Sequence, residues 1–344
     1  MKTFDVGALR QAIAKLRLDG PNDLVQRTLA QHGLSVPGEG TGFQPPFGAS
    51  GAQSAADPVP PGASITTDRF SCKAGSREYL AYLPASAGKG IRGMIVMLHG
   101  CTQTPADFAR GTGMNALAEE HRLLILYPHQ SRGENAQSCW NWFSIGDQRR
   151  GRGEPEILAQ MTLDLAGRHK VPRDRIFVAG LSAGAAMAVI LGQTHPDVFA
   201  AVGAHSGLPF GAARDVPSAF AAMNGNDPGQ TAPRRDARPT PTIVFHGSAD
   251  RTVHPLNGER IAAATLAAGP DQTVLERKTG RIGSRGYSRE ITALVDGRIL
   301  LEHWIVNGLG HAWSGGKPGG SYTDPQGPDA SAEMVRFFLD RPAP

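Results

Sequence analysis

Apolar runs typical of buried strands alternate with helical segments through most of this chain, and this alternation limits the fold more than any other feature. The runs lie within "GMIVMLHG", "LLILYP", "RIFVAG", "FAAVGAHSG" and "TIVFHGSAD". Helices are expected over residues 105–121, 154–169, 183–194 and 256–268. Strands connected through helices pair in parallel, and a parallel sheet needs a cover on both faces. The pattern therefore predicts an α/β protein with a mostly parallel sheet and helices on both faces.

Paired strands are expected at both ends of this alternating region. "RFSCKAG" and "REYLAYLP" alternate like an opening antiparallel pair, and "YSREITAL" and "RILLEHWIV" are candidates for a second pair. A helix over residues 329–339 closes the pattern. We therefore assign residues 65–344 to one large α/β domain.

The first 64 residues have a different character. Residues 1–35 carry apolar positions at helical spacing on either side of a Gly20-Pro21 break, which predicts two short amphipathic helices. Two such helices cannot bury a core alone. We expect them to dock on the main domain or on a second copy of the chain, as in a homodimer. Residues 36–64 are rich in glycine, proline, alanine and serine and are interpreted as a flexible linker.

Charge, hydropathy and cysteine usage exclude several classes of protein. The 344 residues carry a net charge of +4 without a block of lysines and arginines, so no nucleic-acid partner is expected. No stretch approaches the length of a membrane span, and the N-terminus lacks the apolar core of a secretory signal peptide. A cytoplasmic location is the default expectation, while secretion by another route and numbering from a mature form stay open. The three cysteines suit no zinc site, and no metal or cofactor is expected.

Three strand ends carry residues that together indicate nucleophilic catalysis. Ser182 follows "RIFVAG" within Gly-Leu-Ser-Ala-Gly, Asp250 follows "TIVFHG", and His311 follows "RILLEHWIV". Ligands of parallel sheets bind beyond the carboxyl ends of the strands, so these residues are expected at one edge of the sheet. Serine, acid and histidine in this order is the chain order of an α/β-hydrolase triad.

The chemistry of each residue type assigns the roles. A serine hydroxyl is a weak nucleophile at neutral pH and needs a base within hydrogen-bond reach. This role suits His311, because the pKa of histidine lies near neutral pH. Asp250 is expected to fix the histidine tautomer and to stabilise the imidazolium. The loop "HGCTQ" lies at a fourth strand end, and the backbone amides of Cys101 and Ala183 are the candidate oxyanion hole.

Other acids and histidines compete for these roles. Asp227 and Asp236 are rivals of Asp250, but neither follows a strand end. His303 lies within a predicted strand and is expected to be structural or to line the substrate site. The histidines at the ends of buried strands are interpreted as hydrogen-bonded residues of the rim: His99, His205 and His246.

Five motifs narrow the family. "LHGCTQ", "CWNWF", "GLSAGAAMA", "HGSADRTVHP" and "GLGHAWSGG" together resemble the esterase family of polyhydroxybutyrate (PHB) depolymerases, over roughly residues 65–344. The resemblance implies an α/β-hydrolase fold and a serine esterase with Ser182, Asp250 and His311 as its triad. The implied partner is a polyester or a hydroxyalkanoate oligomer. The alternatives are a feruloyl or acetyl-xylan type esterase, and an amide-cleaving hydrolase of an acidic polymer such as polyaspartate.

The resemblance also suggests a disulfide. In the usual strand order of this fold the third and fourth strands are neighbours, and Cys101 and Cys139 follow these strands. A Cys101–Cys139 bond is therefore sterically plausible and would pin the oxyanion loop to the substrate rim. Two reduced thiols are the alternative, which a cytosolic location favours.

Aromatic residues near these strand ends are candidates for the substrate wall. The two tryptophans of "CWNWF" face the same way if the segment is extended, so that both line the cleft or both pack inward. Core packing explains each tryptophan nearly as well as substrate contact does. The asparagine between them is a candidate donor to a substrate carbonyl. The candidate substrate-binding residues are Trp140, Asn141, Trp142, Trp313 and His246.

Overall fold

The computed structural model describes residues 59–226 and 239–340. The predicted N-terminal helices, with the dimer contact expected of them, lie outside the described residues, as do most of the predicted linker and the two rival acids Asp227 and Asp236.

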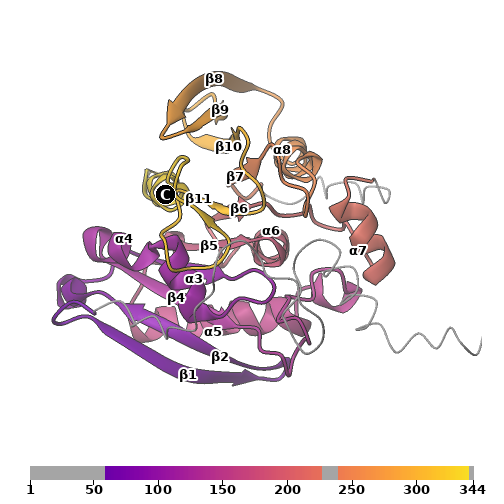
Figure 1. Cartoon of the computed structure of the whole chain (residues 1–344). Helices are drawn as coiled ribbons and strands as arrows, with labels where there is room; N and C mark the ends of the chain where they lie inside the picture. The colour runs from indigo at the N-terminus through magenta and orange to yellow at the C-terminus, as the bar shows by residue number, and fades with distance from the viewer. Residues whose placement is uncertain (1–58, 227–238, 341–344) are drawn as a thin grey trace, which may run out of the picture. The chain divides into compact units, whose positions relative to one another are not determined.

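A ten-stranded sheet organises the described chain, in the order β1-β2-β4-β3-β5-β6-β7-β10-β9-β8 (Figure 1). The six central strands from β4 to β10 are parallel, and an antiparallel pair flanks them on each side. The strands are β1 (Ser64–Cys72), β2 (Gly75–Leu83), β3 (Gly93–Leu98), β4 (Leu123–His129), β5 (Ile176–Leu181), β6 (Ala201–His205), β7 (Thr242–Gly247), β8 (Thr273–Ile282), β9 (Arg285–Leu294) and β10 (Ile299–Val306). A separate short pair joins β11 (Trp313–Ser314) to β12 (Thr323–Asp324).

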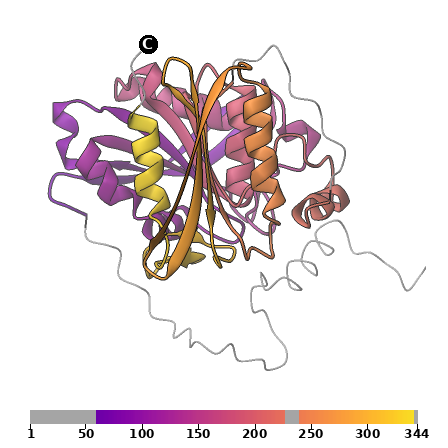
Figure 2. The same ribbon diagram turned by 90° about the horizontal axis from the view of Figure 1, so that it is seen from above.

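Helices cover both faces of this sheet. Helices α5 (Gly153–Arg168), α6 (Ala183–Thr194) and α8 (Leu256–Ala267) contribute buried residues to one apolar layer, with α7 (Val216–Met223) at its margin. Helices α3 (Pro105–Thr112), α4 (Met114–His121) and α9 (Ala330–Leu339) contribute to the other layer. Figure 2 shows α9, in yellow, and α8, in orange, on opposite sides of the strands. This arrangement confirms the predicted α/β-hydrolase fold class.

Period-two alternation explains why the central strands are apolar throughout. Along β3, Met94, Val96 and Leu98 pack in the first layer, whereas Ile95 and Met97 pack in the second. Each of these five side chains has 0% exposure. Successive side chains of a strand point to opposite faces, so a strand covered on both faces is buried at every position.

One local prediction is wrong, and one strand has no counterpart among the predictions. The single helix expected over residues 105–121 is two helices, because Gly113 between them has a left-handed φ of 63°. Strand β8 was not predicted, since all ten of its residues are exposed and their sequence shows no apolar alternation. The antiparallel pairs β1–β2 and β9–β10 confirm the strand pairs expected at both ends.

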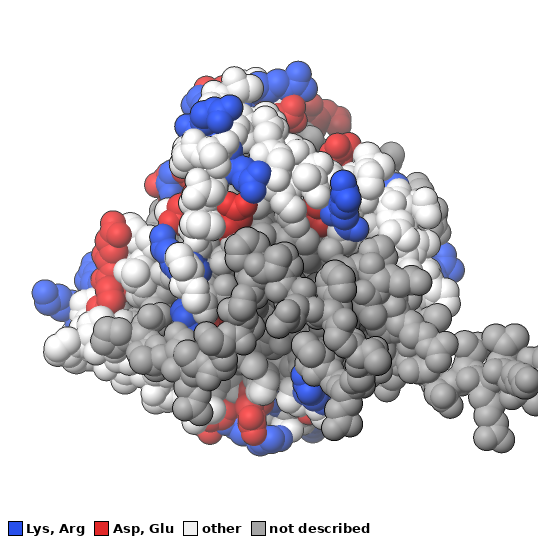
Figure 3. Space-filling view, in the orientation of Figure 1, with Lys and Arg blue, Asp and Glu red and all other residues white. Residues whose placement is uncertain are grey.

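Charges of both signs lie on the surface that β8 and β9 form. Figure 3 shows basic and acidic side chains together at the top of the view. Arg277 pairs with Glu290 at 2.7 Å and Lys278 with Glu276 at 2.9 Å. Arg277 and Lys278 on this hairpin therefore have acidic neighbours. Among the described helices none has the length and apolar character needed to cross a membrane.

Candidate active site

Ser182 lies in the turn between β5 and α6, at the carboxyl edge of the parallel strands. Its φ of 57° with ψ of −120° lies outside the regions that L residues prefer, which is typical of a nucleophile held on a sharp turn. A Cβ on Gly180 would come 2.7 Å from Leu98 O, and one on Gly184 would come 2.6 Å from His99 O. Both positions therefore need glycine, because β5 and α6 approach the end of β3 too closely for a side chain.

Asp250 and His311 form a direct pair at the same edge. His311 Nδ1 donates to Asp250 Oδ2 at 2.8 Å, and the Asp250 side chain is fully buried. The backbone amides of Thr252 and Val253 donate to Asp250 Oδ1, each at 2.9 Å. Burial by itself raises the pKa of Asp250, but the hydrogen bond and the charge of His311 outweigh it and hold the pKa below its ordinary value. The carboxylate is thus ionised and fixes the proton on Nδ1 of His311.

The serine is not hydrogen-bonded to this pair. Within residues 59–226 and 239–340, Ser182 Oγ has no hydrogen-bond partner. Contacts between a nucleophile and its base are often loose in a free enzyme and tighten when substrate binds. The structure therefore brings Asp250 and His311 into contact and leaves Ser182 at the same edge of the sheet, after β5, which β6 separates from β7.

Two backbone amides near Ser182 also donate to no acceptor among the described residues. In the loop after β3, the amides of Gly100, Thr102 and Gln103 each donate a hydrogen bond, whereas the amide of Cys101 meets no acceptor in the described chain. Ala183 is the first residue of α6, where an amide has no partner within its own helix. These free N–H groups are the two that the sequence predicts as the oxyanion hole.

The loop with Cys101 is held by the segment after β4. A disulfide joins Cys101 to Cys139, across 38 residues of sequence. The Thr102 amide donates to Gln137 O at 2.8 Å. Trp140 Nε1 donates to His99 O at 3.1 Å. These three attachments limit how far the Cys101 amide can move, as the predicted disulfide already suggested.

Two of the predicted rim histidines are buried supports. His99 is fully buried; its Nε2 accepts from the Gln130 amide at 3.1 Å, and its Nδ1 donates to Gly100 O at 2.8 Å. His205 is also fully buried, and its Nε2 accepts from the Ser314 amide at 3.0 Å. Burial lowers the pKa of His99 to about 4 and that of His205 to about 3. Both rings therefore stay neutral; His99 holds the chain after β3 and β4, and His205 holds the chain after β10.

His246 is placed behind the acid instead of on the substrate side. Its ring is fully buried, and Nε2 donates to Val253 O at 2.8 Å while lying 3.6 Å from Asp250 Oδ2. Burial lowers the pKa of His246 to about 4, although Asp250 acts in the opposite direction. The predicted substrate contact of His246 does not fit a side chain without exposed surface; the ring instead supports the turn that carries Asp250.

The predicted substrate wall is also largely internal. Trp140 is 0% exposed, Trp142 6% and Trp313 1%. These three side chains therefore pack inward, which is the alternative to lining the cleft. Trp313 stacks on His205 with ring centroids 5.0 Å apart. Asn141 Nδ2 donates to Glu154 Oε1 at 2.7 Å, and its Oδ1 accepts from Asn135 Nδ2 at 2.9 Å. The Asn141 side chain is therefore occupied by protein groups. A position next to a strand end therefore does not show whether a side chain faces the substrate or packs behind the residues that do.

Sequence reasoning missed Glu154, a buried carboxylate next to this region. Glu154 is 2% exposed and lies in the first turn of α5, where the sequence indicates it only as an acid favoured at a helix start. Burial raises the pKa of Glu154 to about 7, and Asp147 adds to this, while Asn141 and Arg77 act in the opposite direction. The available signal was its helical spacing from the buried Leu158, which places Glu154 on the apolar stripe of α5.

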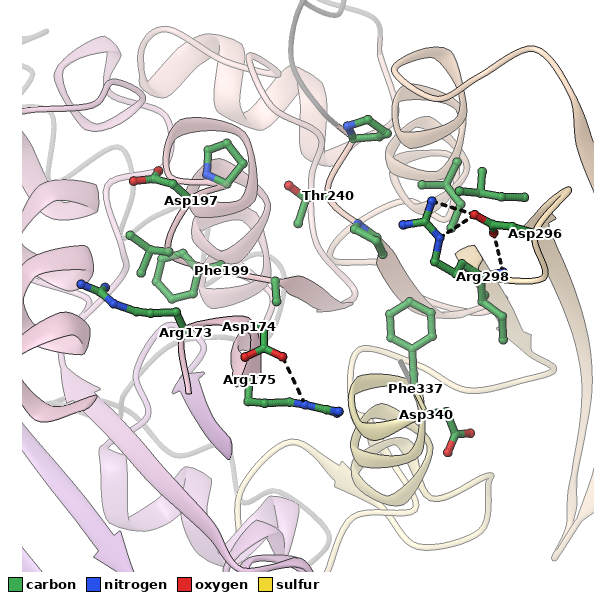
Figure 4. A pocket seen from close by; sticks show the side chains of 18 of the residues that line it. Arg173, Asp174, Arg175, Asp197, Phe199, Thr240, Asp296, Arg298, Phe337 and Asp340 are labelled. Carbon is green, nitrogen blue, oxygen red and sulfur yellow. Dashed lines mark hydrogen bonds and ion pairs between the residues drawn. The ribbon is translucent and has the colours of Figure 1, made fainter. Parts of the chain in front are cut away.

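A cleft of about 880 Å³ lies at the opposite edge of the sheet (Figure 4). Its lining includes Arg175, Ala200 and Pro241, which directly precede β5, β6 and β7. Several charged side chains in its wall pair with their neighbours, as the Asp296–Arg298 contact of 2.8 Å illustrates. None of the predicted catalytic residues lines this cleft. Among the described residues, no group of His, Cys, Asp and Glu side chains is arranged to hold a metal ion.

Comparison with known proteins gives one matching family. The family model described as "Esterase PHB depolymerase" matches residues 77–269. Poly(3-hydroxyalkanoate) depolymerase C of Paucimonas lemoignei is 37% identical over 229 residues, which is 63% of this chain and 54% of the relative. Poly(3-hydroxybutyrate) depolymerase of Ralstonia pickettii is 29% identical over 261 residues, which is 69% of this chain and 52% of the relative. The chain thus spans about half the length of these two relatives.

Carbohydrate esterases are similar as well. Probable acetylxylan esterase A of Aspergillus flavus is 30% identical over 194 residues, which is 52% of this chain and 62% of the relative. The solved structure of the acetyl xylan esterase from Aspergillus awamori superposes with a TM-score of 0.56 at 20% identity, over 72% of this chain and 93% of that chain. This structural likeness concerns the fold.

Proposed function

Since this chain belongs to the esterase family of PHB depolymerases, we propose that it is a serine esterase that hydrolyses the carboxylic esters of a polyester or of hydroxyalkanoate oligomers. One observation carries the proposal. His311 donates to the buried carboxylate of Asp250 at 2.8 Å, at the strand edge that also presents Ser182 on its sharp turn. That pair supplies the oriented base that a serine nucleophile needs.

Acylation begins at the Ser182 hydroxyl. His311 Nε2 takes the hydroxyl proton while Oγ bonds to the ester carbonyl carbon, and the carbonyl oxygen becomes an oxyanion. The amides of Cys101 and Ala183 donate to this oxyanion, a contact that is stronger in the transition state than in the bound ester. The C–O bond to the alcohol then breaks, and His311 gives its proton to the departing alcohol. The acyl group stays on Ser182.

Deacylation repeats these steps with water. His311 removes a proton from a water molecule as its oxygen attacks the acyl carbon, and the same two amides hold the second oxyanion. The bond to Ser182 Oγ breaks, and the serine recovers its proton from His311. Each cycle consumes one water and one ester bond and releases one alcohol and one acid, so the reaction needs no metal or redox cofactor in its balance.

A second candidate function is an esterase of acetylated or feruloylated carbohydrate. The specific observation is the 30% identity to a probable acetylxylan esterase over 194 residues. Both candidates share the acylation chemistry and differ in what binds around the scissile ester. A panel of substrates tested on the wild-type enzyme therefore distinguishes the two candidate functions.

The test measures turnover of p-nitrophenyl butyrate, 3-hydroxybutyrate oligomers, feruloyl esters, acetylated xylan and polyaspartate. We expect the highest kcat/KM on the hydroxybutyrate oligomers. Ser182→Ala is expected to lower kcat by about 10⁶-fold, as loss of a serine nucleophile typically does. A fluorophosphonate probe is expected to label the wild type at Ser182.

Ser206→Ala provides the matched control. Ser206 also has a left-handed φ, 52°, and follows β6, the strand next to β5, but it is buried beside His205. This variant is expected to keep its fluorophosphonate label. An enzyme that processes xylan acetate or feruloyl esters but no hydroxybutyrate ester would refute the polyester proposal. Absence of ester turnover by the wild type would refute both.

A further inference from the structure

A buried polar cluster is connected to the loop that carries Cys101. Its centre is the Glu154 carboxylate. Oε1 accepts from Gln130 Nε2 at 2.6 Å and from Asn141 Nδ2 at 2.7 Å, and Oε2 accepts from the Asn141 amide at 2.7 Å. Arg77 Nη2 lies 3.2 Å from Oε1 and supplies the compensating charge. Glu154 therefore binds side chains from β2 and from the chain that follows β4.

The partners of Glu154 belong to the support of the oxyanion loop. Asn141 ends the segment 135–141, which holds the loop through the disulfide and the two hydrogen bonds described above. Gln130 Nε2 also donates to Cys139 O at 3.1 Å, and the Gln130 amide donates to His99 Nε2 at 3.1 Å. One carboxylate thus fixes both the segment that grips Cys101 and the residue that orients His99.

We propose that Glu154 is a positioning residue of the oxyanion hole: by holding Gln130 and Asn141 it keeps the Cys101 amide aimed at the developing oxyanion. This inference rests on the proposed esterase function. Glu154 itself takes no part in bond making. Its carboxylate accepts three hydrogen bonds from Gln130 and Asn141, so its loss leaves these N–H groups without that acceptor and frees the segment on which the loop rests.

Stability alone does not explain why the Glu154 carboxylate is buried beside the oxyanion loop. Replacing a buried ion pair by apolar groups is often neutral or stabilising, so its presence is poorly explained by stability alone. Glu302 on β10 provides the contrast: its 0% exposed carboxylate pairs with Arg289 at 2.8 Å and with Arg336 at 2.7 Å. Neither of these partners contacts the oxyanion loop. Glu302 is therefore the matched buried carboxylate without the proposed role.

The experiment compares Glu154→Gln with Glu302→Gln in the full chain. Active sites are counted by fluorophosphonate titration, and kcat and KM are measured with p-nitrophenyl butyrate. A butylboronic acid, which forms a tetrahedral adduct with a serine nucleophile, reports the oxyanion hole directly. We expect Glu154→Gln to lower kcat by about 10- to 100-fold, to change KM less than twofold, and to weaken boronate binding by the same factor as kcat.

Glu302→Gln is expected to lower the midpoint of urea unfolding while kcat per titrated site stays at the wild-type value. Asn141→Ala, which removes a partner and keeps the carboxylate, should reproduce the loss of kcat if Glu154→Gln does not fold. In the double variant the two losses should not add, because both act through one contact.

Unchanged kcat and boronate affinity in Glu154→Gln or Asn141→Ala, with an active wild type, would overturn the inference. An equal loss of kcat in Glu302→Gln would also overturn it, since the effect would then be general loosening. A wild type without ester turnover would instead refute the proposed function, which is a separate outcome.

Discussion

Gly184→Ala tests how closely the serine turn is packed against the candidate oxyanion loop. Gly184 is the second residue of α6, and in a helix alanine is favoured over glycine by about 1 kcal/mol. Helix propensity alone therefore predicts a more stable protein. Against this, the new Cβ would come 2.6 Å from His99 O and closer still to Leu98 O.

The clash is the larger effect. Carbon and carbonyl oxygen atoms approach each other to about 3.3 Å, so α6 and the end of β3 must separate by roughly 1 Å. Overpacking of this kind costs about 1–3 kcal/mol. A displacement of about 1 Å at a catalytic group lowers activity by about 100-fold. Both effects fall on the junction that sets Ser182 against the Cys101 loop.

The assay measures urea unfolding and kcat for p-nitrophenyl butyrate, normalised to fluorophosphonate-titrated sites. Gly167→Ala is the control: Gly167 lies in α5, and its new Cβ would meet no heavy atom within 4 Å. We expect Gly167→Ala to be neutral or up to about 1 kcal/mol more stable, with unchanged kcat. Gly184→Ala should lose both stability and kcat.

A Gly184→Ala variant at least as stable as the wild type, with unchanged kcat, would refute this reasoning. It would mean that α6 and β3 can separate freely, and that the glycine is not needed for the close approach. Loss of stability without loss of kcat would refute only the catalytic half of the argument.

Three further predictions follow from the site. Asp250→Asn should lower kcat by about 10⁴-fold with the fold intact, measured by ester turnover and circular dichroism, because the amide favours the wrong tautomer of His311; a loss under tenfold contradicts the role. Native protein should show one reactive thiol, at Cys72, and three after denaturing reduction, and Cys139→Ser should cost about 4 kcal/mol in urea unfolding; three native thiols contradict the disulfide. The free energy of unfolding should rise between about pH 4.5 and 6.5, because burial lowers the pKa values of His99, His205 and His246, so that these rings bind protons only when unfolded, each contributing up to about 1.4 kcal/mol per pH unit. Burial also lowers the pKa values of His195 and His303, which adds to the rise, whereas the raised pKa of Glu154 opposes it; a flat or falling profile contradicts this balance.

Local pattern was sufficient for the central sheet and for the strand ends that carry Ser182, Asp250 and His311. It was insufficient where the outcome depends on partners far away in the chain. All ten residues of β8 are exposed, so only pairing with β9 makes this segment a strand. The break at Gly113 was missed because Phe108, Met114 and Ala118 continue the helical spacing of buried residues across it.

Side-chain roles around the site divide in the same way. Trp140 and Asn141 stand next to a strand end, which suggested substrate contact, yet one is buried and the other is bound to Glu154. The sequence indicates that such residues are near the site. It does not indicate whether their side chains face the substrate or pack into the protein interior.

By itself, the sequence determined the alternating α/β layers, the chain order of serine, acid and histidine, and the two glycines beside Ser182, because each follows from spacing and from the conformational needs of single residues. Only the tertiary structure decided that the Cys101 amide meets no acceptor in the described part of the chain, that Trp140, Trp142 and Trp313 pack inward, and that Glu154 joins the segments beside the oxyanion loop. These features depend on burial and on hydrogen bonds between segments distant in sequence, which no local pattern encodes.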